Sequence, residues 1–314
     1  MTVHPSHQQA SFLDNLRELT RRLIGAESKH PDRPSVREMA KTIQEVLKTG
    51  DIKVPIFPAA AQHTTELIGD PNARISEIAS LIETDAALCA ELLRVANSAA
   101  FSGGTEIRTV QRAVAQLGLN RLRSMLFVVV RNAMFPRRTY KDLHARYFQQ
   151  SLAVACACEA LEPILGISIE GSFLFGILHN IGCAGLLNII TELQHSEELP
   201  RDLTVEEVEH LVSLTYEPCG AIIARKWHLP LDFQHAIRYH NTPERLTNSG
   251  DRAPALLTHL AIELCASYHI GDFPPHLSNI HHSPHIQKLD LDPDALNRAA
   301  AKTKVHFADL RSCF

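Results

Sequence analysis

Hydrophobic residues recur at helical spacing along almost the whole 314-residue chain. Near the N-terminus, for example, Leu16, Leu19 and Leu23 lie three or four residues apart and share one face of a helix. No stretch keeps the alternation of hydrophobic and polar residues that a half-buried strand requires. The pattern therefore predicts an all-α protein.

Three predicted helices begin at residues that favour a helix start. Ser35–Glu38 and Thr204–Glu207 each have the spacing of a capping box, in which each side chain bonds to the other residue's backbone N–H. Asp292 is a capping residue followed by Pro293, and proline suits the first helical position. Breaks between helices are expected at 48–58, 102–105, 248–254 and 273–284. The first break separates two N-terminal helices from the main body.

The longest apolar run, Phe173–Ile190, is about as long as a membrane span. His179 and Asn180 lie at its centre, where a polar pair would be costly in lipid. We therefore expect a helix buried in a protein core and no association with a membrane. Burying this pair without partners would cost about 1–3 kcal/mol per unsatisfied group, so the two side chains should bond either to neighbouring helices or to a ligand.

Composition narrows the class of protein. Hydrophobic residues make up 45% and charged residues 21% of the chain, which is typical of a globular protein. The net charge of −4 argues against a wholly basic nucleic-acid-binding protein. The seven cysteines include no CxxC pair, and the N-terminus has no signal-peptide pattern. We expect a cytoplasmic protein without a disulfide framework.

Two segments carry opposite charge. Segment 107–146 holds nine Lys and Arg residues and one acid, Asp142, whereas segment 192–217 holds eight acids and one base, Arg201. One interpretation is that both segments form solvated faces. The other is that the basic segment is a docking surface for an anionic partner or nucleic acid. The candidate docking residues are Arg108, Arg112, Arg121, Arg123, Arg137 and Arg138.

Within the basic segment, Thr109–Phe127 has the outline of a helix-turn-helix. Gly118 is suited to end the first helix and Asn120 to cap the second. A DNA-reading second helix should be polar on its outer face, but this one continues into Phe127–Val130. A packed helical hairpin is the favoured interpretation, and nucleic-acid binding is not expected.

Motifs for catalysis are few. His281-His282-x-x-His285 has the spacing of a helical metal site, but nearby prolines such as Pro284 favour a solvated loop. The chain has no Walker loop, no GxGxxG, no GxSxG and no HExxH.

Seven stretches of the chain form a recognisable series: Val54–Pro58, Asp85–Phe101 with its Ala-Asn-Ser signature, Ile107–Leu126 with Leu117-Gly118, Phe173–Gly182, Cys219–Ala221, Trp227–Pro230 and Ala236–His240. In this order they resemble the HDOD family, the HD-related output domain of bacterial signalling proteins. The resemblance covers roughly 54–243. It implies a multi-helix HD-like bundle with an N-terminal helical subdomain.

HDOD domains resemble HD phosphohydrolases, which hold one or two metal ions with His and Asp side chains. By this resemblance, Gln150 stands where the first histidine is expected, and His179-Asn180 where a His-Asp pair is expected. Pro218 replaces the next histidine and His240-Asn241 a His-His pair, while the final aspartate falls near Ile262. Two histidines without a carboxylate make a poor site for a hard metal ion. We expect no bound metal; any remaining site would use His179 and His240.

The positions Gln150, His179, Asn180, His240 and Asn241 are therefore candidates for a vestigial pocket. Either internal hydrogen bonds or a small, nucleotide-like ligand would fill it. Two alternatives stay open. One is a residual metal-dependent nucleotide phosphohydrolase, for which bound metal would be evidence; the other is a nucleic-acid-binding regulator that uses the basic face 107–146, for which binding that weakens steeply with salt would be evidence.

The resemblance implies a division into an N-terminal helical extension (1–52), an HDOD domain (53–250, with a bundle at 53–135 and an HD-like core at 140–250) and C-terminal helices (251–314). The expected function is non-catalytic signal transduction through contacts with another signalling protein, without a cofactor. The extension would pack on the body, form a homodimer or dock a partner.

Overall fold

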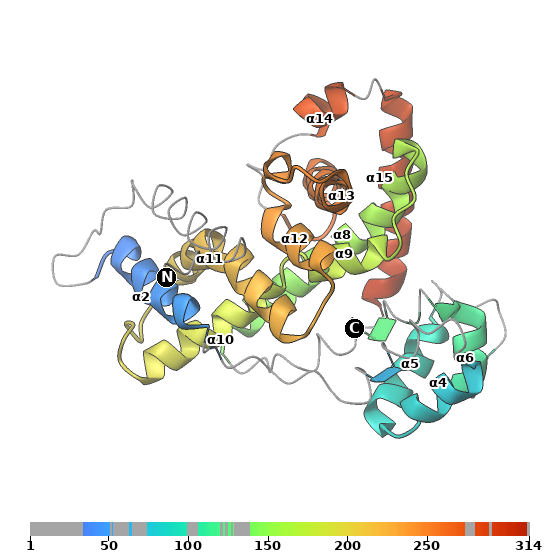
Figure 1. Cartoon of the computed structure of the whole chain (residues 1–314), viewed down its shortest axis with the longest axis horizontal. Coiled ribbons are helices and arrows are strands. Elements are labelled where there is room, and N and C mark those ends of the chain that lie inside the picture. The colour runs from blue at the N-terminus through green and yellow to red at the C-terminus, as the bar shows by residue number, and fades with distance from the viewer. Residues whose placement is uncertain are drawn as a thin grey trace, which may run out of the picture. The chain divides into compact units, whose positions relative to one another are not determined.

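The structure is a computed structural model of the chain. It describes residues 34–50, 52, 63–64, 74–98, 106–119, 122, 125–126, 128, 139–273, 280–288 and 291–312, without the side chains of 86, 87 and 293. Every regular element in these ranges is helical, which confirms the all-α prediction (Figure 1).

The chain forms two compact units that do not follow its linear order. The first unit joins Met1–Val54 to Asn180–His228, and the second joins Pro55–His179 to Leu229–Phe314. The chain passes from one unit to the other between His179 and Asn180, at the polar pair inside the long apolar run. The boundaries at 52, 135 and 250 expected from the sequence stay a prediction.

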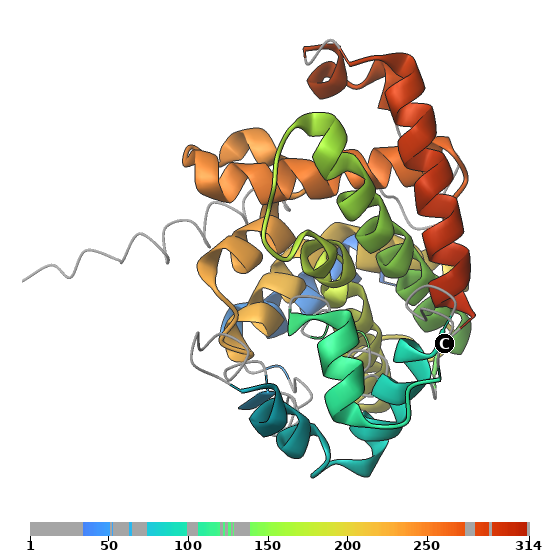
Figure 2. The ribbon, with the colours of Figure 1, turned by 90° about the vertical axis from the view of Figure 1, so that its right-hand side faces the viewer.

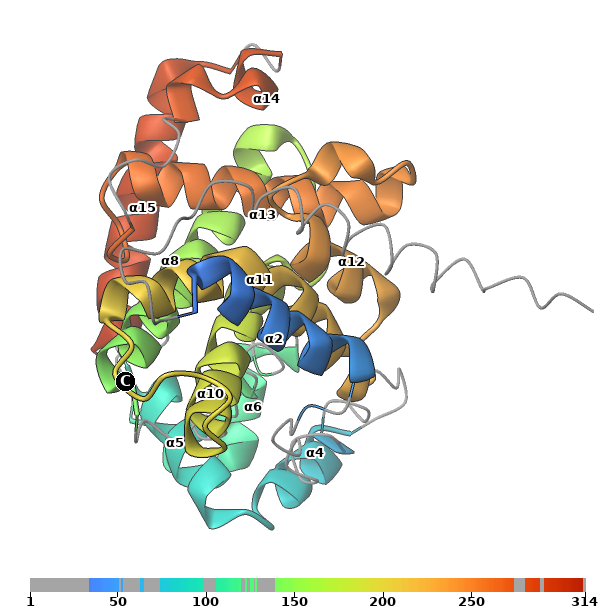
Figure 3. The same ribbon diagram turned by 90° about the vertical axis from the view of Figure 1, so that its left-hand side faces the viewer.

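The first unit contains α2 (Val36–Thr49), α10 (Ile181–His195) and α11 (Val205–Lys226). The capping boxes predicted at Ser35–Glu38 and Thr204–Glu207 are both present, which confirms these helix starts. The apolar face of α2, with Met39 and Ile43 fully buried, packs on α11 (Figure 3). Residues 36–49, predicted to precede the main body, thus pack as part of a unit with α11.

Close contact between α10 and α11 depends on glycine. A Cβ atom at Gly182 would lie 1.9 Å from the carbonyl oxygen of Tyr216, and one at Gly185 would lie 2.6 Å from Ile223 Cδ1. Any side chain at Gly182 would therefore force the two helices apart.

The second unit is built around α8, its longest described helix. The helices that pack directly on α8 are α9, α13 and α15 (Figure 2, where α15 is red and α8 green). The unit's main helices are α8 (Lys141–Leu165), α9 (Ser172–Leu178), α12 (Leu231–Tyr239), α13 (Ser249–Ser267) and α15 (Pro293–Arg311). Asp292 caps α15 ahead of Pro293, as predicted.

The same unit contains α4 (Ile75–Ile82), α5 (Ala86–Ala96) and α6 (Val110–Leu117), which pack on one another. Gly118 ends α6 with a positive φ of 74°, which confirms its predicted role. Asn120 and the continuation at Phe127 lie outside the described residues, so the helical hairpin stays a prediction.

Segment 280–288 differs from the loop predicted for it. It forms two helical turns, η2 (Ile280–His282) and α14 (Pro284–Gln287), because Ile280 and Ile286 are buried and fix its conformation. Pro284 lies in the first turn of α14, a position that tolerates proline. The short helix η1 (Pro243–Arg245) follows α12.

The long apolar run forms two helices, α9 and α10, separated at the polar pair. By length and composition alone, Ser172–His195 could cross a membrane, but 89% of its apolar window is buried. Helices in the core of a soluble protein have the same property. The observation agrees with the buried position predicted from the sequence.

Candidate functional site

His179 directly follows α9, and three contacts fix that helix. Glu162 on α8 accepts hydrogen bonds from the backbone N–H of Ile169 (2.6 Å) and the hydroxyl of Ser172 (2.8 Å). The Phe175 ring stacks on Phe233 of α12, with ring centroids 4.0 Å apart. These contacts fix the start and the middle of α9, the short helix that leads directly into His179.

Gly176 lets α9 approach α8 closely. A Cβ atom at this position would lie 2.4 Å from the Cα atom of Ala155, a distance that no real Cβ contact shows. Glycine is therefore required at position 176, one turn before His179, so that the backbones of α9 and α8 can pack together.

His179 and His240 are both buried, and their rings meet edge to face, with centroids 5.4 Å apart and planes at 90°. Each ring is held by its Nδ1 atom. His179 Nδ1 lies 2.7 Å from the Gly176 carbonyl oxygen, and His240 Nδ1 lies 3.0 Å from that of Ile237. A carbonyl oxygen only accepts, so Nδ1 carries the proton in both rings. In the neutral rings Nε2 is then the acceptor, which is the usual arrangement of metal-binding histidines.

The other pocket candidates do not complete a metal site. Gln150 is buried, and its amide donates a 2.8 Å hydrogen bond to the Asp272 carbonyl oxygen, so it connects α8 to the turn after α13. Asn180 belongs to the first unit, where it is the N-terminal cap residue of α10. Asn241 is exposed. Of the five candidates, the structure brings His179 and His240 together.

The donor set does not fit the metal ions that HD enzymes use. Among the described residues, no group of three or more His, Cys, Asp or Glu side chains is placed to hold a metal ion. Two imidazoles without a carboxylate supply neither the negative charge nor the ligand number that a hard divalent cation needs.

The histidines of the His281-His282-x-x-His285 motif also do not point toward one shared position. The Tyr268 hydroxyl lies 3.1 Å from His281 Nε2, whereas the His285 ring faces His259, with centroids 5.4 Å apart. The two ends of the motif therefore contact different side chains of the protein.

The buried cysteines are poor nucleophiles. Burial raises the pKa of Cys156, Cys158, Cys219 and Cys265. A thiol that stays protonated reacts slowly, so these side chains serve packing.

The basic face is described only in part. Arg108 and Arg112 are exposed around the start of α6, and Arg108 forms a 2.6 Å ion pair with Glu106. The other docking candidates, Arg121, Arg123, Arg137 and Arg138, lie outside the described residues.

The sequence profile of the HDOD domain matches residues 54–243, about three-fifths of the chain. This chain belongs to the HDOD family. The matched range agrees with the limits expected from the sequence motifs.

Solved structures share the HD-like fold of this HDOD protein. A "Putative metal-dependent phosphohydrolase" of Shewanella amazonensis SB2B superposes with a TM-score of 0.67 at 21% identity, covering 87% of this chain and 99% of that one. A "Putative signal transduction protein" of Marinobacter aquaeolei VT8 gives a TM-score of 0.64 at 20% identity, covering 96% of this chain and 65% of that one. At these identities the likeness establishes the fold alone.

A curated relative, an uncharacterized protein of Treponema pallidum (strain Nichols), is 27% identical over 205 residues. The match covers 60% of this chain and 37% of the relative. The chain thus matches little more than a third of that protein's length.

The HDOD signature residue Asn97 has a structural role. Its side-chain oxygen accepts from the backbone N–H of Ile107 (2.7 Å), and its amide donates to the carbonyl oxygens of Ile107 (2.7 Å) and Leu93 (2.8 Å). Asn97 therefore joins the end of α5 to the segment before α6. The Ala-Asn-Ser motif positions two helices of the N-terminal bundle.

One pocket was not predicted from the sequence. It is lined by α8, the turn after α13 and α15, and it includes Arg146, Lys304 and Arg311. The only sequence signal was the spacing of Lys304, Phe307 and Arg311, which places them on one face of a helix.

Proposed function

We propose that this HDOD protein is a non-catalytic regulatory module of signal transduction that acts by binding another protein. The observation that carries the proposal is the His179–His240 pair, because these two rings form the site without a neighbouring carboxylate ligand among the described residues. An HD-type hydrolytic site activates its nucleophile as a metal-bound water. The two histidines, with Asn180 in the usual place of an aspartate, offer no carboxylate to hold that metal among the described residues.

The site instead supports the arrangement of the helices. His179 follows α9 and His240 follows α12, and each ring bonds back to the last turn of its own helix. The pair thereby joins two helix ends in the core of the second unit. A partner or ligand that alters this contact would alter the relation between α9 and α12.

The basic segment 107–146 is the proposed docking surface for an acidic face of the partner. Exposed arginines attract an acidic protein surface and raise its association rate. Arg108 and Arg112 are the two docking candidates whose positions are described.

Catalysis is tested by a phosphodiesterase assay of the full chain with Mn²⁺, using bis-p-nitrophenyl phosphate and cyclic dinucleotides as substrates. The proposal predicts no hydrolysis above the buffer blank. Metal-dependent turnover that is lost in His179→Ala would support a residual phosphohydrolase instead.

Partner binding is tested by affinity capture and mass spectrometry with the wild type and Arg108→Glu/Arg112→Glu. We expect a specific protein partner to be captured by the wild type and lost from this variant. The control is Arg298→Glu/Lys302→Glu, which makes the same charge change on α15 and should keep the partner. Capture of nucleic acid that weakens steeply with salt would point to a nucleic-acid-binding regulator.

A further inference from the structure

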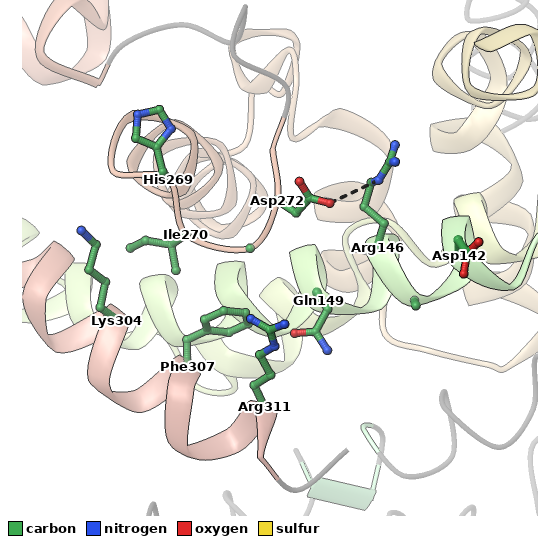
Figure 4. A pocket seen from close by; sticks show the side chains of 11 residues that line it. Asp142, Arg146, Gln149, His269, Ile270, Asp272, Lys304, Phe307 and Arg311 are labelled. Atoms are coloured by element: carbon green, nitrogen blue, oxygen red, sulfur yellow. Dashed lines mark ion pairs between the residues drawn. The ribbon is translucent and has the colours of Figure 1, made fainter. Parts of the chain in front are cut away.

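The second unit contains a pocket of about 590 Å³, separate from the His179–His240 pair, between α8, the turn 269–272 and the C-terminal half of α15 (Figure 4). This volume is within the range of small-molecule sites, about 300–1,000 Å³. Its lining residues are Asp142, Ala145, Arg146, Gln149, His269, Ile270, Gly271, Asp272, Lys304, Phe307 and Arg311.

The wall formed by the turn 269–272 is fixed against α8. His269, Gly271 and Asp272 all have positive φ values, of 53°, 87° and 60°. A Cβ atom at Gly271 would lie 2.5 Å from Ala153 Cβ, and Gln150 bonds to the Asp272 carbonyl oxygen. The wall is therefore preformed, which lowers the entropic cost of binding.

Positive charge on the pocket comes mainly from α15. Lys304 and Arg311 lie on the same face of α15, on either side of Phe307 (Figure 4). Within the described part of the chain, neither cation forms an ion pair, whereas Arg146 pairs with Asp272 at 3.3 Å. Two cations that form no ion pair among the described residues match a phosphate dianion better than a single carboxylate.

Acceptors lie on the α8 side of the pocket. Gln149 Oε1 is buried without a hydrogen-bond partner among the described residues, and Asp142 adds a carboxylate (Figure 4). A buried acceptor without a donor is costly, so a ligand that brings an N–H or O–H group to Gln149 would be favoured. Ile270 and Phe307 supply the apolar part of the lining.

We propose that this pocket binds a small organic phosphate of about mononucleotide size. Its phosphate would lie against Lys304 and Arg311, and a donor group of its base or sugar would reach Gln149. The three proposed ligand contacts, Lys304, Arg311 and Gln149, are not HDOD pocket candidates and lie outside the docking segment 107–146, which contributes Asp142, Ala145 and Arg146 to the pocket wall. The site is therefore independent of whether the chain is catalytic.

The test is isothermal titration calorimetry of the full chain with 5′-AMP and 5′-GMP, with inorganic phosphate and adenosine as the two partial ligands. We expect at least one nucleotide to bind at least tenfold more tightly than either adenosine or inorganic phosphate. Lys304→Ala/Arg311→Ala should weaken that binding at least tenfold. The matched control, Arg298→Ala/Lys302→Ala, removes the same charge from the opposite side of α15 and should change binding less than twofold.

Circular dichroism melting checks that each variant is folded. If the double variant is unfolded, Lys304→Glu alone, at an exposed position, replaces it and should also weaken binding at least tenfold. The proposal is overturned if no nucleotide binds at 10 mM, if adenosine or inorganic phosphate binds equally well, or if the α15 variants bind like the wild type.

Discussion

The imidazole rings of His179 and His240 meet edge to face in the core, and each is oriented by a backbone carbonyl of its own helix. This is how a histidine is held when its other nitrogen serves a ligand. The orientation of the rings is thus of the kind that a metal-binding histidine needs, while no carboxylate completes a metal site with them among the described residues.

His240→Ala should destabilise the protein strongly. The His240 side chain is fully buried, so its removal leaves a cavity beside His179 and deletes its hydrogen bonds to α12. We expect the free energy of unfolding to fall by about 2–4 kcal/mol. Urea unfolding followed by circular dichroism measures it. His210→Ala, at an exposed position on α11, should stay within about 0.5 kcal/mol of the wild type, and equal losses in both variants would contradict a packing role for His240.

Gly176→Ala tests the approach of α9 to α8. The new Cβ atom would meet the backbone at Ala155, which cannot move aside like a side chain, so a loss of about 3 kcal/mol is expected. Gly250→Ala is the matched control. Its Cβ atom would lie 3.4 Å from Asn248 Oδ1 at the start of α13, and it should be neutral or slightly stabilising. Thermal melting of the two variants should separate them clearly; similar melting temperatures would show that α9 and α8 have room between them.

Asn97→Ala removes the hydrogen bonds that join α5 to the segment before α6. The backbone groups of Ile107 lose both partners, and we expect a loss of about 1–3 kcal/mol. Gln111→Ala, exposed on α6, should change stability by less than about 0.5 kcal/mol. Chemical denaturation is the measurement. A loss no larger than that of the control would mean that Asn97 has another role in the HDOD signature.

Stability should fall in mild acid because of His285. Burial, followed by the nearby His259, holds the pKa of His285 below its usual value of 6.5, although Glu263 and Glu244 act in the opposite direction. The folded state therefore binds a proton less readily than the unfolded state. The contribution of neutral His285 is complete above about pH 6.5 and is lost as the pH falls through the lower folded-state pKa.

The matching experiment compares melting temperatures from pH 8 to pH 5 in the wild type and in His285→Gln. The wild type should lose more stability than the variant below pH 6.5. Parallel curves would show that His285 titrates normally in the folded protein.

Local sequence signals predicted the helix ends well. The capping boxes at Ser35–Glu38 and Thr204–Glu207 depend on neighbouring residues alone, so no knowledge of the tertiary fold was needed. The family motifs likewise pointed to His179 and His240 as neighbours.

Features that depend on distant segments were missed. The pocket at Lys304 needs α15 to pack beside α8, about 150 residues earlier in the chain, and no local pattern encodes that contact. The prolines near segment 280–288 predict a loop. The segment forms helical turns instead, because the buried side chains of Ile280 and Ile286 fix its conformation. The sequence predicts that the polar pair at 179–180 is buried. It does not predict that the chain passes from one compact unit to the other between these two residues.

The central claim is that this HDOD chain holds no catalytic metal, and the metal content of the protein tests it most directly. The full chain, purified without chelators or an affinity tag that binds metal, would be analysed by inductively coupled plasma mass spectrometry. The account predicts iron, manganese, nickel and zinc all far below one equivalent per chain. Near-stoichiometric content of any of them, lost in His179→Ala, would contradict it.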